Sequence, residues 1–114
     1  MERVLEVTTS AKTITDNDLG KVVSACAETT ITLPAAGAGK VVTIRVGGAP
    51  VTAGGAKGAT NPVGVKVTGS VTGLGASGAL SLNKAKAVVG DEVTLVSGAA
   101  TWYPVNVKGA WAVA

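Results

Sequence analysis

The chain lacks most of the residues on which enzyme chemistry depends. Its 114 residues include no histidine, no phenylalanine and one cysteine. Without histidine there is no Ser-His-Asp or Cys-His relay and no imidazole metal site. The seven acidic residues are mostly spread singly along the chain. We therefore expect a protein that is not an enzyme and that carries no cofactor and no metal.

Aromatic and charged residues are also scarce, at 3% and 15% of the chain. Charged residues usually make up about 25% of a soluble domain. A monomer of this size hides only about 60–70% of the surface of its unfolded chain, usually with the help of large aromatic anchors. Such a chain is expected to bury surface against copies of itself, so we predict a homo-oligomer.

Partners other than protein are not indicated by the charge pattern. The net charge is +3 and the pI is about 9.3, but Lys and Arg occur singly, without interleaved aromatic residues. We therefore expect no nucleic-acid partner. No apolar run approaches the roughly 20 residues of a membrane span, and charge interrupts the first apolar stretch as it would not in a signal peptide, so no membrane partner is expected.

The lone Cys26 excludes an intramolecular disulfide and favours assembly in a reducing compartment. Its small apolar neighbours predict a buried thiol, with a reactive thiol as the alternative.

The residues that are abundant favour strands and turns. Apolar and polar residues alternate with period two in several segments, and glycine or proline separates many of them. No clear internal repeat emerges. We predict an all-β fold: a compact domain rich in Gly, Val and Thr, built as a β-sandwich, a β-prism or a short β-helix. The segments expected to form strands are residues 5–8, 30–33, 42–46, 63–68, 80–82, 92–95 and 103–108.

The domain organisation is expected to be simple. Residues 1–12 are predicted to form an N-terminal arm, and residues 13–114 a single all-β domain. The stretch from residue 47 to 78 is rich in glycine, which fits tight corners or close backbone approach. Within it, residues 49–61 are alternatively a long flexible loop.

Three short motifs resemble ligand sites, and each has a structural explanation. The glycine pattern of residues 73–78 matches a dinucleotide-binding turn, but a strand-like segment follows it rather than a helix. Residues 16–20 resemble a calcium loop without its distal glutamate, so an Asx-type turn is favoured. Asp91 and Glu92 are neighbours on a predicted strand, where they would point to opposite faces.

The three aromatic residues are the predicted subunit interface. Trp102 and Tyr103 form either the main core anchor or a hot spot between subunits. Trp111 lies close to the C-terminal end, where residues rarely reach the core of a monomer, so an interface role is expected for it.

The order of four segments resembles that of small all-β bacteriophage virion proteins, a group that includes head-decoration or cement proteins, head fibres and tail-fibre modules. The resemblance covers roughly residues 13–107 and implies a β-rich homotrimer. The middle of this chain is longer and richer in glycine than that pattern, and its tail continues to Trp111. The segments are TITLP at residues 30–34, GKVVTI at 39–44, GDEVTLV at 90–96 and TWY at 101–103.

On this resemblance we expect a capsid decoration protein that binds the outer capsid surface as a homotrimer and stabilises the head. The major capsid protein is the expected partner, and the virion, assembled in the host cytoplasm, is the expected location. The arm is predicted to pair with a capsid strand by β-augmentation. The alternative is a fibre or a receptor- or carbohydrate-binding module, although few aromatics are available to stack on sugars. The arm residues expected to bind the capsid are Arg3, Val4, Leu5, Glu6 and Val7.

Overall fold

The all-β prediction is confirmed. The structure, a computed structural model, describes residues 4–35, 37, 39–48, 63–71, 78–82, 85–99 and 101–113. Within these ranges the helical content is one short 3-10 turn, η1 (Asp16–Asp18). The strands are β1 (Val4–Val7), β2 (Ala11–Thr13), β3 (Val22–Ala25), β4 (Thr29–Thr32), β5 (Val41–Val46), β6 (Val65–Val71), β7 (Gly78–Leu82), β8 (Glu92–Ser97), β9 (Trp102–Lys108) and β10 (Ala112–Val113).

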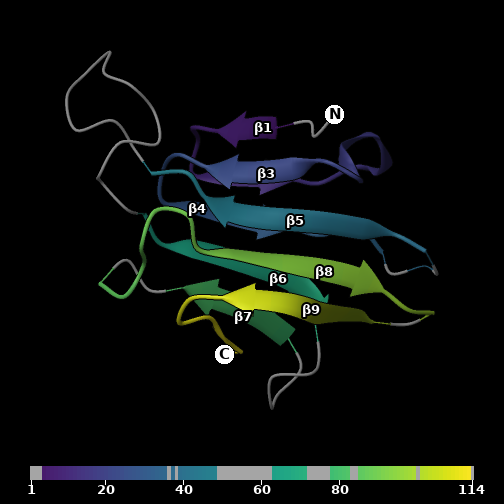
Figure 1. Ribbon diagram of the computed structural model, residues 1–114. Coiled ribbons are helices and arrows are strands. Elements are labelled where there is room, and N and C mark those ends of the chain that lie inside the picture. The colour runs from purple at the N-terminus through teal and green to yellow at the C-terminus, as the bar shows by residue number, and fades with distance from the viewer. Residues whose placement is uncertain are drawn as a thin grey trace.

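The strands form two mixed halves. The first half has the order β1-β3-β5-β8-β9, and the second contains β2, β4, β6, β7 and β10. Figure 1 shows the first half in front, with β4, β6 and β7 behind it. One ladder pair, between Val71 of β6 and Trp102 of β9, joins the halves. The outer strands along this path are β1 and β2.

The first six strands alternate between the two halves. The chain thus makes three successive passes, each with one strand in the first half and one in the second. β1, β3 and β5 pair in parallel in the first half, and β2, β4 and β6 pair in parallel in the second. Val4, Val22 and Thr43 share one register, although the intervals between them differ. Unequal intervals conceal this three-fold recurrence in the sequence, which explains why no repeat was predicted.

The core lies between the inner faces of the two halves. The inner row Leu5–Val23–Ile44–Val93 crosses the first half, and Ile31–Val67–Leu80 crosses the second. Alternation places every second residue of these strands inside, as expected from the period of a strand. The largest fully buried side chains of the core are Trp102, Ile14, Ile31, Ile44, Leu80, Leu82, Leu95, Val23, Val42, Val46 and Val67.

The predicted strands are each found, but β2, β3 and β10 were not predicted. β3 is buried at all four positions, so its sequence shows no alternation. Continuous apolar character is typical of a parallel strand with neighbours on both sides. The predicted loop at residues 49–61 and the glycine turn at 73–77 lie outside the described residues.

The segment predicted as an N-terminal arm, residues 1–12, lies within the sheet from Val4 onward. β1 runs parallel to β3, and Val7 is buried in the core with 3% exposure. β2 pairs in turn with β4. Residues 4–13 therefore form the first pass of the fold in this structure. Cys26 is buried, as its neighbours predicted.

Candidate functional site

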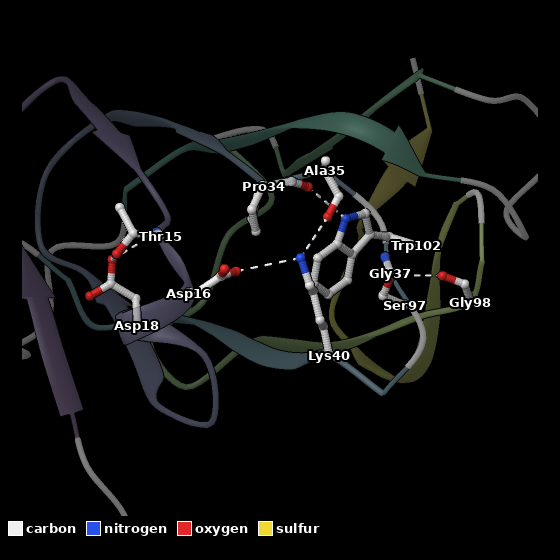
Figure 2. A network of polar contacts seen from close by, with 10 residues as sticks. All are labelled: Thr15, Asp16, Asp18, Pro34, Ala35, Gly37, Lys40, Ser97, Gly98 and Trp102. Carbon is white, nitrogen blue, oxygen red and sulfur yellow. Dashed lines mark hydrogen bonds and ion pairs between the residues drawn. The ribbon is translucent and has the colours of Figure 1, made fainter.

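Three of the four segments that carry the resemblance contribute residues around the indole of Trp102 (Figure 2). Trp102 begins β9 and is fully buried, and its Nε1 donates a hydrogen bond to the carbonyl oxygen of Pro34, 3.1 Å away. Pro34 follows β4, so this bond connects the two halves close to their only described ladder pair. A buried indole N–H needs a partner, and the end of the TITLP segment supplies it.

Ser97, at the end of β8, forms hydrogen bonds with Gly37 and Lys40. Its backbone N–H donates to the carbonyl oxygen of Lys40 at 2.8 Å, and its Oγ accepts from the backbone N–H of Gly37 at 2.7 Å. The same hydroxyl donates to the carbonyl oxygen of Gly98 at 3.0 Å, as Figure 2 shows. Ser97 is buried, and these bonds use both the donor and the acceptor capacity of its hydroxyl.

Lys40 completes this network, which we call the Trp102 junction. Its Nζ donates to the carbonyl oxygen of Ala35 at 3.1 Å and lies 3.4 Å from Oδ1 of Asp16. The Asp16 side chain is 76% exposed, so this ion pair contributes little. Three of the four segments thus supply residues to one junction, namely Pro34, Lys40 and Trp102, and Ser97 directly follows the fourth.

The three aromatic residues predicted for a subunit interface differ in exposure: two are buried and one is accessible. Trp102 lies in the core with 0% exposure and Trp111 is 8% exposed, with its Nε1 donating to the carbonyl oxygen of Lys108 at 3.0 Å. A side chain buried within its own chain has little surface to offer a partner, so of the two alternatives the core anchor describes Trp102. Only Tyr103 is accessible, at 46%.

An exposed apolar surface lies beside these residues on β9. Tyr103, Val105 and Val107 are 46%, 61% and 41% exposed, and they are half of the six large hydrophobic residues exposed in the described part of the chain. Val105 is the extra residue at an irregularity between the pairs Leu95–Pro104 and Thr94–Asn106. The irregularity brings apolar side chains to both faces of the strand, because it shifts the alternation by one residue. We call these three residues, which lie along one strand but not all on one face of it, the β9 surface.

The predicted capsid-binding residues form the outer strand of the first half. Arg3 lies outside the described residues; Val4 is 54% exposed, Glu6 is exposed, and Leu5 packs partly against the core. The backbone N–H of Cys26 donates to the carbonyl oxygen of Val7 at 2.8 Å, so Val7 and Leu5 turn their backbone groups toward β3. By alternation, the backbone groups of Val4 face the outer edge.

β2, at one edge of the second half, is protected. Lys12 stands in the inner row with Ile31 and Val67, and its Nζ lies 3.5 Å from Oδ2 of Asp18. The Thr9 hydroxyl donates to the carbonyl oxygen of Ala11 at 2.9 Å. An inward-pointing charge is a common device against the addition of a further strand, and a partner strand on β2 would meet Lys12.

Asp18 is held by the turn that precedes β3. Its Oδ2 accepts from the backbone N–H of Thr15 at 3.0 Å and from the Thr15 hydroxyl at 3.2 Å, and Lys21 lies 3.8 Å from Oδ1. The backbone hydrogen bond from Thr15 is the largest influence that lowers the pKa of Asp18; partial burial opposes it, and Lys12 and Lys21 lower the pKa further. Within the described ranges, no group of three or more His, Cys, Asp or Glu residues is placed to hold a metal ion.

The other carboxylate motif is divided between two roles. Asp91 is buried, and its Oδ2 accepts from the backbone N–H of Val88 at 2.9 Å. Glu92 pairs with Arg45 across the ladder, with Oε2 and Nη2 3.2 Å apart. The two carboxylates therefore hold a turn and a cross-strand ion pair.

No protein-family model matches the chain, and no curated protein and no solved structure matches it significantly. Among the described helical residues there is no stretch with the length and apolar character needed to cross a membrane.

Proposed function

We propose that this chain is a structural protein of a bacteriophage virion, which decorates the outer capsid surface as a homotrimer and stabilises the head. In this proposal its partners are the major capsid protein and two further copies of itself. It is made in the host cytoplasm and resides in the virion. The proposal starts from the order of the four segments, and it is supported by the Trp102 junction, to which three of them contribute Pro34, Lys40 and Trp102 and which Ser97 joins directly after the fourth.

Of the three β architectures that the sequence left open, we propose the short β-helix for the first three passes. Support comes from the parallel ladders that stack β1, β3 and β5 on one side and β2, β4 and β6 on the other. The antiparallel strands β8 and β9 then extend the first stack beyond β5 by further strand pairing. In this view Lys12 and Asp18 cap one side of the first coil, as solenoids require polar caps at their ends.

The observation that carries the capsid proposal is the difference between the outer strands β1 and β2. A strand added to β2 would meet the charge of Lys12, whereas a strand added to β1 would continue the apolar row that begins with Leu5 and Val23. Main-chain hydrogen bonds would give such a contact its affinity, and the alternate side chains its specificity. We therefore place the capsid contact on the outer edge of β1, with Val4 beside it.

The contact between copies is proposed to be the β9 surface. Its three apolar side chains lie on one strand, and the nearby charge of Lys108 stands opposite Glu92 in the ladder. A second copy would thus meet apolar side chains along β9, with Lys108 beside them. Three copies joined in this way hold three equivalent β1 edges, and weak individual contacts with the shell then add through effective concentration. A part that binds only assembled shells stabilises them by mass action.

The capsid contact is tested with a matched pair of proline variants. Val4→Pro removes a backbone donor that faces outward from β1, and Ala11→Pro removes the corresponding donor on β2, each at the first residue of its strand. We expect Val4→Pro to lose co-sedimentation with empty heads of the parent phage, and Ala11→Pro to retain it. Equal binding by both variants would refute a contact on β1. Deletion of residues 1–9 is less informative, since it also removes the buried Val7.

The contact between copies is tested by charge insertion. Val105→Lys places a charge on the β9 surface, and Val88→Lys places one on a valine of nearly equal exposure, 62% against 61%, outside β9. The purified protein should have the mass of a trimer in light scattering. Val105→Lys should reduce that mass to a monomer, whereas Val88→Lys should leave it unchanged. A wild-type monomer contradicts the proposal, as does a trimer that Val105→Lys leaves intact.

A further inference from the structure

The end of β9 leaves one side chain of the inner row uncovered. Val107 stands opposite Val93, at the β9 end of the inner row that crosses the first half. Val93 and its neighbour Ile44 have 0% exposure, whereas Val107 is 41% exposed. A row that is buried along its length and open at its last member lacks a covering layer there. A partner seated at this end of the sheet would complete the row.

The backbone of β9 does not offer such a partner a regular edge. Pro104 has no backbone N–H, and Val105 is an extra residue in the pairing with β8. Prolines and irregularities of this kind are common where a sheet edge resists the addition of a further strand. A partner at β9 is therefore expected to pack on side chains rather than to extend the sheet.

The outer face of the first half carries a second apolar patch. Val41, Val96 and Tyr103 form one row across β5, β8 and β9, the strands that lie side by side in Figure 1. Val41 is 40% and Tyr103 46% exposed. We call these three residues the outer-face row. Val4 and Val88, the other exposed valines outside β9 in the described part of the chain, lie on the β1 edge and ahead of β8, away from this row.

The surroundings of the outer-face row fit a contact between proteins. In the next row, Thr43 and Thr94 share a hydrogen bond of 3.1 Å between their hydroxyl oxygens. The charges begin one row further, where Arg45 pairs with Glu92. An apolar centre, then uncharged polar side chains, then charges at the rim is the usual anatomy of a protein interface.

We propose that the end of β9 in one copy packs on the outer-face row of the next copy, three times around a ring. A cyclic trimer joins two different surfaces of neighbouring copies, and these are the two apolar patches that the chain offers besides β1. Val105 and Val107 then lie against Val41 and Val96 of the next copy, which covers the open end of the inner row. This inference rests on the proposed homotrimer and supplies the second surface of its contact. The three β1 edges take no part in it.

The test is disulfide cross-linking of the purified full chain with Val41→Cys, Val105→Cys or both, oxidised and separated on a non-reducing denaturing gel. Cys26 is buried, so it stays out of the reaction. We expect the double variant to give a covalent trimer as its main product, whereas one new cysteine per copy links at most two copies. Within one copy β8 separates β5 from β9, and their distance of roughly 9–10 Å is beyond the reach of a disulfide.

The matched control replaces Val41→Cys by Val88→Cys in the double variant, because Val88 is also exposed but lies outside the outer-face row. This control should give no covalent trimer, and an equal yield from both double variants would contradict the contact. Light scattering of the reduced proteins separates the inference from the proposed function. A trimeric mass without covalent trimer overturns the packing on the outer-face row and leaves the homotrimer intact. A monomeric wild type overturns both.

Discussion

The indole Nε1 of Trp102 lies 3.1 Å from the carbonyl oxygen of Pro34, and this hydrogen bond joins residues 68 positions apart. It connects the start of β9 with the chain that leaves β4, where the two halves also share the ladder pair Val71–Trp102. The bond therefore lies at the junction between the halves. Its loss should affect the whole fold, because the indole is also the largest fully buried side chain described.

Replacing this indole provides the first prediction. Trp102→Phe keeps an aromatic ring but leaves the Pro34 carbonyl without its donor, so the free energy of unfolding should fall by about 1–3 kcal/mol. Trp102→Ala should cost about 3–5 kcal/mol, because it also leaves a cavity. Tyr103→Phe, on the exposed neighbour, should stay within about 0.5 kcal/mol of the wild type. Urea unfolding measures all three, and a neutral Trp102→Phe would contradict the role given to the bond.

The second prediction is that protonation of Asp18 in acid lowers the free energy of unfolding. Its pKa is lowered in the folded chain, chiefly by the hydrogen bond from the backbone N–H of Thr15, so folding favours the ionised form. The stability from Asp18 is therefore complete above the ordinary aspartate pKa of about 3.9 and is lost as the pH falls through that value toward the folded pKa. Asp18→Asn should reduce stability at neutral pH and flatten the acid part of the profile.

The measurement is the urea midpoint between neutral pH and about pH 2, a range that spans the carboxyl titration. Asp16→Asn is the control, because it removes a carboxylate that is 76% exposed. If Asp18→Asn retained the full acid dependence of the wild type, the loss would belong to other carboxylates.

Lys12 predicts a change in self-association. Lys12→Leu makes its inner row apolar, in line with Ile31 and Val67, and removes the charge that blocks the outer edge of β2. We expect this variant to form assemblies larger than those of the wild type as concentration rises, because an unprotected edge accepts further strands. Sedimentation velocity detects them.

Lys21→Leu is the matched control for this test. Lys21 also lies near Asp18, at 3.8 Å, but it precedes β3 rather than standing in an outer strand. Equal behaviour of the two variants would show that the ion pair with Asp18, and not the position of Lys12, keeps the edge from associating.

The sequence was sufficient to predict a strand where one face of that strand is buried and the other is accessible. β5 alternates between buried and accessible residues along its whole length, and so does β8. Both were predicted within a residue or two. β3 escaped prediction because it is buried on both faces, and β2 because Lys12 occupies an inner position that pattern reading assigns to an apolar residue.

The candidate sites were harder to foresee, because they depend on register between distant segments. Trp102 was expected to be either a core anchor or an interface residue, and composition alone did not decide between them. The irregularity at Val105, which exposes valines on both faces of β9, is invisible in a sequence that alternates cleanly there. A groove lined by Glu28, Lys66 and Ser81 forms only because the ladders between β4, β6 and β7 bring these residues together.

The last prediction concerns Gly47, which lies close to the side chains of Ser24 and Cys26. The hydrophobic pattern of the sequence did not predict this contact. A Cβ on Gly47 would fall far inside contact distance of Ser24 Oγ and 3.1 Å from Cys26 Sγ. Both neighbours are buried, so neither side chain can turn into solvent. Gly47→Ala should therefore destabilise the protein by about 1–3 kcal/mol, the usual cost of overpacking. Ser24→Ala removes the nearer obstacle, so Gly47→Ala should cost less in that background, with recovery limited by Cys26. Urea unfolding of the two single variants and the double variant measures the coupling, and additivity within about 0.5 kcal/mol would show that Gly47 and Ser24 do not approach each other this closely.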